Sequence, residues 1–514
     1  MASPEAAPYF ELDRKPRVHC SVVAVRSFAG RNVVPEAVSM LHDTQNRGED
    51  GTGIAVYDGY SGTFYSHKDL GLVQHALAPE KLDGRFKGSL VFGHNRYATS
   101  GKDGPQKDEE LRACLQPYVV AHKGKWLSLA HNGNFPQEYT AKMLAELPSG
   151  IPFQSGEGEN IVDSEILAWR IMFSEGANWK EKVQNGLNGA PGAYSLVIGT
   201  DQGDMFGIKD PRGIRPLVAA RLDDGFAILS ETRGLEHIPG VLKRKEVGAG
   251  QMVHVTPEGD VNLYQLFDKV PQARCAVESI YLMHPFSFEA GGLEVRGIRG
   301  RMGAQLAEKY PFPREYTKVG VPASGSEIAN AYARALGEVA EDFIKKDSYR
   351  PKQRTFMLGS DGERDVELER KFTISESVRG LKLVIVDDSV IRGKTTGRLV
   401  RALKAAGAIE VHVLSGSPRF VEICNLGVDI AKKEELIALD KDSSFNERTN
   451  AEIAKIIGAD SINFLDNKGL TDAIDGKDLG VCTACMGGTH PIQELGCGAN
   501  DVYSINPQSL GSWN

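Results

Sequence analysis

The strongest constraint on the fold is one short segment, residues 383–397, with the sequence LVIVDDSVIRGKTTG. Four consecutive apolar residues are typical of a strand that is buried on both faces, as in a parallel sheet covered by helices. The run ends in Asp387 and Asp388 and then in a loop that contains Arg392, Gly393, Lys394, Thr395 and Thr396. Because open parallel sheets bind ligands beyond the carboxyl ends of their strands, the segment predicts a binding site at this point.

The residue types indicate a phosphorylated sugar as the ligand. Two adjacent carboxylates can accept hydrogen bonds from vicinal hydroxyls or help to hold a hydrated Mg²⁺. The loop offers backbone N–H groups and hydroxyls to a phosphate at the start of the helix expected over residues 395–407. An acid pair alone would equally suit a solvated strand end, but the complete arrangement favours a phosphoribose site.

Length, charge and cysteine count narrow the class of protein. The chain has 514 residues, which is too long for one hydrophobic core, so two or more domains are expected. A net charge of -8 without a long basic block argues against nucleic acid or a membrane surface as the main partner. The first 19 residues lack the apolar centre of a secretory signal. Seven cysteines at this length indicate metal-binding or catalytic thiols in a reducing cytoplasm.

The pattern along the chain predicts two unlike domains. Residues 20–265 hold short β-type runs bounded by turn residues, which indicates packed sheets, with a helix that has Asp163 at its N-cap. Residues 275–465 alternate strands with helical stretches, one of them expected over 326–346, which predicts a parallel sheet with crossover helices. The remaining pieces are a leader, residues 1–19, and a Gly-rich tail with a CxxC pair, residues 466–514.

The segment 383–397 resembles the phosphate- and ribose-binding motif of type I phosphoribosyltransferases. Similarity to one family, the amidophosphoribosyltransferases, extends from Cys20 to about Pro491 and includes VRGIRGRMG (295–303), VPASGSEIA (321–329), RTFM (354–357) and SPRF (417–420). The resemblance implies that 5-phosphoribosyl 1-diphosphate binds to Asp387, Asp388 and the loop 392–396, with Mg²⁺ held through the acid pair. It further implies a pyrophosphate loop with Ser324 and Gly325, and a closing loop with Lys345 and Arg354.

Five motifs in the first half resemble the class II glutamine amidotransferase domain, which is an α-β-β-α sandwich with an N-terminal nucleophile. They are NRGEDGTGIAVYDG (46–59), HNRYATSG (94–101), LAHNGNF (129–135), VDSEILAW (162–169) and KDPRGIRPLV (209–218). The resemblance implies that Cys20 is the nucleophile and that its own α-amino group is the base, which requires removal of residues 1–19. It also implies an oxyanion hole formed by Asn132 and Gly133. Arg96 and Asp163 would bind the α-carboxylate and α-ammonium groups of glutamine.

Four other cysteines match the ligands of a [4Fe-4S] cluster in the branch of the family that carries propeptides. They are Cys275, Cys424, Cys482 and Cys485. Thiolates are the natural ligands of such a cluster, although four cysteines can also bind Zn²⁺. Cys114 and Cys497 fit neither pattern.

The chain departs from the family pattern at six positions. Ser21 stands where Gly is usual, and Asn46 where His is usual. The other four are Ala323 for Asp, Lys394 for Thr, and His284 and Phe286 for Arg and Asp. These changes are compatible with a catalytic rate or a substrate that differs from those of other family members.

The family implies a cytoplasmic homo-oligomer, a dimer or tetramer, that makes 5-phosphoribosylamine from glutamine and 5-phosphoribosyl 1-diphosphate and that purine nucleotides inhibit. Two alternatives are an ammonia-dependent transferase with a silent glutaminase half and a non-catalytic nucleotide sensor. An aminosugar synthase is excluded because its second half lacks the site at 383–397.

Overall fold

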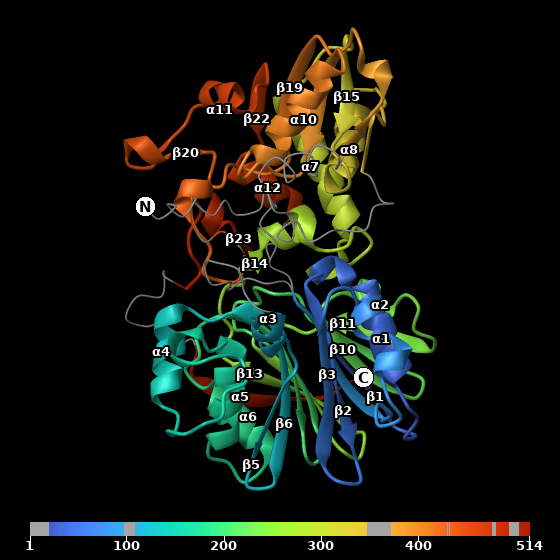
Figure 1. The fold of residues 1–514 in the computed structure, drawn as a ribbon, viewed down its shortest axis with the longest axis vertical. Helices are drawn as coiled ribbons and strands as arrows, with labels where there is room; N and C mark the ends of the chain where they lie inside the picture. The colour runs from blue at the N-terminus through green and yellow to red at the C-terminus, as the bar shows by residue number, and fades with distance from the viewer. Residues whose placement is uncertain are drawn as a thin grey trace, which may run out of the picture.

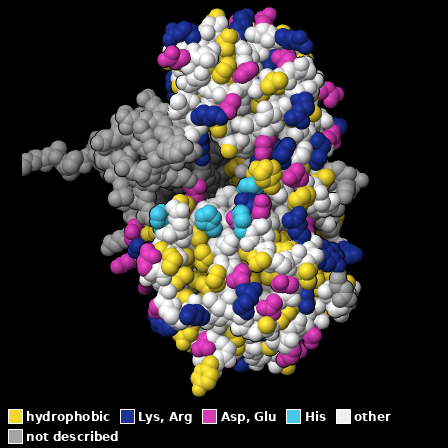
Figure 2. Space-filling model, turned by 90° about the vertical axis from the view of Figure 1, so that its right-hand side faces the viewer, with side chains coloured by type: hydrophobic (Ala, Val, Ile, Leu, Met, Phe, Trp, Pro, Cys, Tyr) yellow, Lys and Arg dark blue, Asp and Glu magenta, His cyan; other side chains and the backbone are white. Residues whose placement is uncertain are grey.

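The computed structural model describes residues 20–96, 108–346, 372–428, 430, 432–474, 480–492 and 503–513. These residues form two bodies stacked along the long axis of the molecule (Figure 1). The lower body is built mainly from the first half of the chain and the upper body from the second half. Figure 2 shows basic and acidic side chains interspersed over one face of both bodies, without a large patch of one sign.

The lower body contains two seven-stranded sheets that lie face to face. The first sheet has the order β11-β9-β10-β1-β4-β2-β3. Its strands are β1 (Ser21–Ser27), β2 (Gly51–Asp58), β3 (Thr63–Leu70), β4 (Leu90–Arg96), β9 (Val218–Leu222), β10 (Gly225–Leu229) and β11 (Val241–Glu246). The neighbours of β1 are both antiparallel to it, so Ser21 lies opposite Asn95 of β4.

The second sheet has the order β24-β13-β12-β8-β7-β6-β5. Its strands are β5 (Tyr118–His122), β6 (Lys125–Asn134), β7 (Ala193–Thr200), β8 (Met205–Lys209), β12 (Gln251–Val255), β13 (Val261–Phe267) and β24 (Ile505–Ser512). The last strand comes from the far end of the chain. The sequence placed residues 466–514 in a separate tail, but β24 pairs with β13 and covers what would otherwise be an open edge of the lower body.

Helices cover the outer faces of both sheets and produce an α-β-β-α sandwich. They are α1 (Val34–Asp43), α2 (Val73–Ala76), α3 (Asp108–Ala113), α4 (Gln137–Ala145), α5 (Asp163–Phe173) and α6 (Trp179–Leu187). The period-two alternation of β1 shows how the layers arise: Val22 and Ala24 point between the sheets, whereas Val23 and Val25 pack with α1. The predicted sandwich is therefore confirmed.

The upper body is built on a four-stranded parallel sheet with the order β15-β18-β19-β22. Its strands are β15 (Tyr316–Gly320), β18 (Lys382–Asp387), β19 (Glu410–Ser415) and β22 (Ser461–Phe464). The helices are α7 (Val295–Lys309), α8 (Ser324–Ala335), α10 (Lys394–Ala405), α11 (Asn450–Ile457) and α12 (Asn467–Ile474). Alternate residues of β18 belong to different cores, Val384 and Val386 to one and Leu383 and Ile385 to the other, which explains the unbroken apolar run.

Short strands complete the upper body. β14 (Arg274–Cys275) pairs in parallel with β23 (Val481–Cys482), and β16 (Ile344–Lys346) pairs with β17 (Phe372–Ile374). A two-stranded ribbon joins β20 (Leu439–Asp440) to β21 (Asn446–Glu447). Within the described ranges, none of the helices is long and apolar enough to cross a membrane.

Two local predictions were wrong. The helix expected over 326–346 ends at Ala335, because Gly337 adopts a positive φ of 72° and residues Ile344–Lys346 form a strand instead. Asp163 is the first residue of α5 rather than its N-cap, which is Val162. Its carboxylate instead accepts hydrogen bonds from the backbone N–H groups of Ser164 and Phe135.

Candidate active sites

The strand order brings the predicted glutaminase residues to one end of the sandwich. Cys20 directly precedes β1, and the antiparallel pairing puts it beside the end of β4, where Arg96 lies. The end of β4 is joined to the end of β6 through the His94 imidazole, whose Nε2 lies 3.2 Å from the His131 carbonyl oxygen. Asn132 and Gly133 follow His131 on β6. This end of the sandwich faces the upper body (Figure 1).

Asn132 carries the clearest chemical signal in the lower body. Its side chain is only 1% exposed, and among the described residues its Nδ2 amide group has no acceptor. Buried donors in folded proteins are nearly always paired, so an orphan of this kind calls for a functional explanation. A side-chain amide aimed at a developing oxyanion is one such explanation.

Gly133 is fixed beside it by steric demand. Its φ is 148°, and a Cβ atom at this position would lie 1.8 Å from the Ala193 carbonyl oxygen on β7. No other residue fits without moving the strand. Because residue 133 has no side chain, a bound substrate can approach its backbone N–H group directly.

The two buried histidines near the site are unsuited to act as bases. Burial lowers the pKa of His94 to about 3 and also lowers the pKa of His131. The His131 Nδ1 atom lies 2.9 Å from the Ser164 hydroxyl, so its ring is held in a structural contact. A lowered pKa makes each imidazole a weaker base, which favours another group as the base for a cysteine nucleophile.

The two glutamine-binding candidates are positioned by different devices. Arg96 is 7% exposed and donates a hydrogen bond to the Cys114 carbonyl oxygen. Gly48 of the NRGED motif packs against the backbone of Arg96, where a Cβ atom would lie 2.7 Å from its carbonyl carbon. Asp163 is held by the backbone contacts at the start of α5. The part of the HNRYATSG motif that follows Arg96 lies outside the described residues.

A buried ionic network links Cys20 to the upper body, and the sequence reading did not single it out. Arg47 donates through Nε to the Cys20 carbonyl oxygen at 3.0 Å, and its other nitrogens pair with Glu231 at 2.7 Å and Glu278 at 3.0 Å. Glu278 also pairs with Arg215 at 3.0 Å. Arg47 and Arg215 were detectable only as members of the matched motifs NRGEDG and KDPRGIRPLV.

Three of the departures from the family pattern have partners here. The Ser21 hydroxyl donates to the Thr44 hydroxyl at 2.7 Å. The Asn46 amide donates to Glu231 at 3.1 Å, and the His284 backbone N–H donates to the other oxygen of Glu231 at 2.9 Å. Glu231 therefore joins the Asn46 side chain to the backbone at residue 284, and the second contact does not depend on the side chain of His284.

The acid pair of the upper body lies at the carboxyl end of β18, as the sequence predicted. Asp387 and Asp388 are each 1% exposed. Asp388 accepts hydrogen bonds from the Ser324 hydroxyl and, at 2.7 Å, from the Ser389 hydroxyl. Gly325 packs on the strand end, because a Cβ atom there would lie 2.6 Å from the Val386 carbonyl oxygen. The structure thus brings the loop containing Ser324 and Gly325 to the acid pair.

The loop after the acid pair leads into α10. Gly393 is the N-cap, with a φ of 74°, and a Cβ atom there would lie 2.1 Å from the Ile437 side chain. Arg392 pairs with Glu435 at 2.5 Å, Lys394 is exposed, and Thr396 is 4% exposed. Thr395 lies between them at the first turn of the helix.

The remaining substrate candidates are not brought to this site in the described residues. Lys345 is exposed on β16 and pairs with Asp342. Arg354 lies outside the described residues, as does Cys497. Ala323, which replaces an acidic residue of the family, is exposed immediately before α8.

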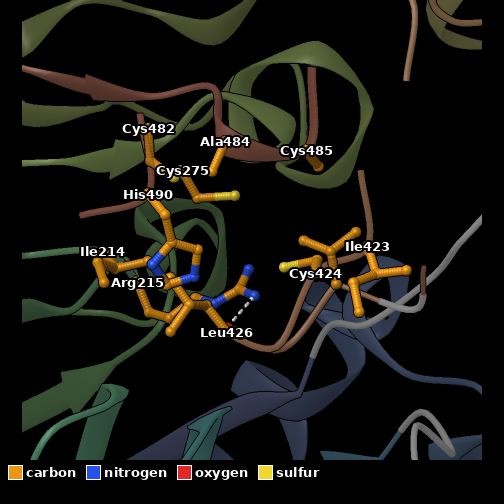
Figure 3. Close-up of a pocket in the computed structure, with 11 residues that line it drawn as sticks. Ile214, Arg215, Cys275, Ile423, Cys424, Leu426, Cys482, Ala484, Cys485 and His490 are labelled. Carbon is orange, nitrogen blue, oxygen red and sulfur yellow. Dashed lines mark hydrogen bonds between the residues drawn. The ribbon is translucent and has the colours of Figure 1, made fainter. Parts of the chain in front are cut away.

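Four cysteines from three separate segments line one cavity between the two bodies (Figure 3). They are Cys275, Cys424, Cys482 and Cys485, and the parallel pairing of β14 with β23 places Cys275 opposite Cys482. Burial raises the pKa of the Cys275 thiol to about 12 and that of Cys482 to about 11. The Arg215 guanidinium points into the same cavity (Figure 3). Four thiols with a nearby cation form a donor set that fits a thiolate-ligated metal group.

The comparisons with known proteins agree with this geometry. Residues 312–416 match the model of the phosphoribosyl transferase domain family. The amidophosphoribosyltransferase of Synechococcus elongatus is 33% identical over 491 residues, which cover 94% of this chain and 93% of the relative. The chain belongs to the amidophosphoribosyltransferase family.

Other amidophosphoribosyltransferases support the same assignment. The Bacillus subtilis enzyme is 33% identical over 459 residues, 88% of this chain and 90% of the relative. A solved structure of the Bacillus subtilis glutamine phosphoribosylpyrophosphate amidotransferase, complexed with ADP and GMP, has a TM-score of 0.78 and 30% identity. It covers 92% of this chain and 97% of that chain. The protein is accordingly an enzyme with a class II glutamine amidotransferase half and a phosphoribosyltransferase half.

Proposed function

We propose that the protein converts 5-phosphoribosyl 1-diphosphate, glutamine and water to 5-phosphoribosylamine, glutamate and diphosphate, the first step of purine synthesis. Full-length similarity to amidophosphoribosyltransferases supports the reaction. The observation that carries the glutaminase half is the unpaired, buried Nδ2 amide of Asn132 next to Gly133. An amide donor kept without an acceptor at the position matched to the oxyanion hole supports an active glutaminase half over a silent one.

The glutaminase half-reaction uses Cys20 as the nucleophile. Its thiol transfers a proton to its own α-amino group, and the sulfur attacks the side-chain carbonyl carbon of glutamine. The carbonyl oxygen becomes an oxyanion, which accepts hydrogen bonds from the Asn132 side chain and the Gly133 backbone N–H. The carbon–nitrogen bond then breaks, the nitrogen leaves as ammonia with the proton from the α-ammonium group, and water hydrolyses the thioester. Arg96 and Asp163 hold the α-carboxylate and α-ammonium groups of glutamine.

The transferase half-reaction takes place at the end of β18. Asp387 and Asp388 orient the ribose through its hydroxyls, and the loop 392–396 binds the 5-phosphate at the start of α10. Ser324 and Gly325 face the diphosphate, and Lys345 and Arg354 belong to a segment that closes over the substrate. Mg²⁺, held through the acid pair, would offset the charge of the leaving diphosphate. Ammonia attacks C1 as the bond to diphosphate breaks, so the protein contributes mainly positioning and electrostatics.

The cysteine cavity is proposed to hold a [4Fe-4S] cluster that pins residues 480–492 to the rest of the upper body. Among the described residues, no set of three or more His, Cys, Asp or Glu side chains is arranged to hold a single metal ion. Four thiolates also suit a tetrahedral Zn²⁺, and the choice of a cluster rests on the match of all four cysteines to the cluster ligands of the family. We also propose a cytoplasmic homo-oligomer, a dimer or tetramer, that purine nucleotides inhibit; the related Bacillus subtilis structure contains ADP and GMP.

Substitution of the nucleophile tests the proposal. Cys20→Ala is expected to abolish glutamine-dependent synthesis and to retain synthesis from added ammonium salt, because the second site is untouched. Cys114→Ala is the matched control, since Cys114 is a half-buried cysteine of the same body without a proposed role. Wild-type protein that makes the product from ammonium salt alone would indicate a silent glutaminase half. Wild-type protein that makes none from either nitrogen source would indicate a sensor.

A further inference from the structure

The segment of residues 425–427, which directly follows Cys424, lies against the proposed oxyanion hole. The Asn134 amide donates to the Asn425 carbonyl oxygen at 2.8 Å. A Cβ atom on Gly427 would lie 3.2 Å from the carbonyl carbon and 3.4 Å from the carbonyl oxygen of Gly133. Residues almost 300 positions apart in sequence are therefore in direct contact, and one of them is the glycine assigned to stabilise the oxyanion.

The segment is itself held firmly from the side of the upper body. The Arg215 guanidinium donates to the Leu426 carbonyl oxygen at 2.8 Å, as drawn in Figure 3, and is in turn paired with Glu278. The Asn425 side chain lies 2.7 Å from Nε2 of His490, another residue of the cysteine cavity. The Cys424 backbone N–H donates to the Ile430 carbonyl oxygen at 2.9 Å.

Gly133 is consequently enclosed on two sides. The Ala193 carbonyl oxygen of β7 occupies the space on one side, and Gly427 occupies the space on the other. An oxyanion donor works only when its N–H group is aimed at the position the oxygen will occupy. A displacement of about 1 Å in such a group can lower the rate by about 100-fold. Gly427 contacts the Gly133 carbonyl group, which belongs to the peptide unit after the N–H donor. A segment outside the glutaminase sandwich thus limits the direction of the N–H through the backbone dihedral angles of Gly133.

We infer that residues 425–427 form a positioning element for the oxyanion hole of the glutaminase half. The inference rests on the proposed function, which assigns Gly133 to that hole. Asn425 and Gly427 do not touch the reacting atoms. They hold the Asn134 side chain and the Gly133 carbonyl group, and so restrain the backbone that carries the Gly133 N–H. Because Cys424 directly precedes the segment, one continuous stretch of backbone runs from the wall of the cysteine cavity to the proposed oxyanion hole.

Gly427→Ala tests this role. The new methyl group would lie 2.9 Å from an Arg215 nitrogen and close to the Gly133 carbonyl group. We expect kcat for glutamine hydrolysis to fall by at least about tenfold, with KM for glutamine changed by less than about twofold. Synthesis from ammonium salt and the metal content should match wild type. Gly150→Ala is the control, because Gly150 has a positive φ of 83°, compared with 99° for Gly427, but no atom within 4 Å of its Cβ position.

A second variant approaches the same contact from the other side. Asn134→Ala removes the hydrogen bond to Asn425 without adding a methyl group to the segment, so it keeps the test valid if Gly427→Ala fails to fold. We expect it to lower kcat for glutamine in the same way, and the double variant to lose less than the product of the two single losses.

The inference is overturned if both single variants hydrolyse glutamine at the wild-type rate. It is also overturned if glutamine-dependent and ammonia-dependent synthesis fall equally, since that result would indicate a general loss of structure. A Cys20→Ala protein that still hydrolyses glutamine would instead refute the proposed function itself. The two failures are therefore distinguishable.

Discussion

Asn132→Ala is the substitution that separates the two half-reactions most cleanly. The variant removes a side-chain amide whose Nδ2 has no acceptor among the described residues, so no existing hydrogen bond of that atom is lost. Loss of one oxyanion donor typically costs about 100- to 1,000-fold in kcat, or about 2.7–4 kcal/mol of transition-state stabilisation. We expect glutamine hydrolysis to fall within that range.

Stability should respond differently from activity. An unsatisfied buried donor costs about 1–3 kcal/mol, so its removal offsets the packing that a truncated side chain loses. The free energy of unfolding is therefore expected to change by no more than about 2 kcal/mol. This contrast distinguishes a catalytic amide from one that merely supports β6.

The assay compares two rates on the same preparation. Glutamate release from glutamine reports the first half-reaction, and diphosphate release with ammonium salt reports the second. Asn262→Ala, on β13 of the same sandwich, is the control for truncation of an amide side chain on a strand without a proposed role. The reasoning is refuted if Asn132→Ala hydrolyses glutamine within about threefold of wild type, or if it loses both activities to the same extent.

Three further substitutions address the other sites. Asp388→Asn should abolish amine transfer while glutamine hydrolysis persists; equal loss of both rates in a folded protein would contradict two separate sites. Cys482→Ser should remove the iron and the brown colour and lower the melting temperature, and stoichiometric zinc without iron in anaerobically purified wild type would disprove the cluster. Burial alone would raise the pKa of Glu278, but the charges of Arg47 and Arg215 hold this pKa below its usual value of 4.5. Its stabilising contribution is thus present above about pH 4.5 and is lost as the pH falls through the lower folded-state value. Glu278→Gln should lower the free energy of unfolding by about 3–5 kcal/mol at pH 7. The variant should also lose less stability than wild type as the pH falls, measured by urea unfolding at several pH values. An unchanged dependence of stability on pH would contradict the network.

The sequence was sufficient to predict the elements with strong periodicity or complete motifs. The apolar run 383–386 predicted a buried parallel strand, and both of its faces are covered in the structure. The four matched cysteines come from three segments spread over residues 275–485, yet they line one cavity. The strand followed from its own apolar run, whereas the set of four cysteines followed from the resemblance to the family.

Contacts that depend on tertiary structure could not be predicted. Nothing in the residues 505–512 indicates that they pair with β13, because edge pairing depends on which strand is left open by the rest of the fold. The position of Asp163 was missed because Phe135, 28 residues earlier, supplies the backbone N–H that its carboxylate binds. The close approach of Gly427 to Gly133 likewise exists only between distant segments.

The buried contacts of Glu231 are another feature that the sequence did not predict. The sequence marked Asn46 and His284 as separate departures, with no relation between them. In the structure both donate to the carboxylate of Glu231. Only the Asn46 contact depends on the changed side chain, because a backbone N–H is present at position 284 whatever the residue.

The most direct test of the account is the N-terminal residue of the active protein. In a chain that keeps His19, the nitrogen of Cys20 is part of an amide and cannot accept the thiol proton. Intact-mass spectrometry and N-terminal sequencing, combined with glutamate-release kinetics on the same sample, should show that the active chain begins at Cys20. Protein that still carries Met1 or Ala2 and hydrolyses glutamine at the full rate would contradict the N-terminal nucleophile mechanism.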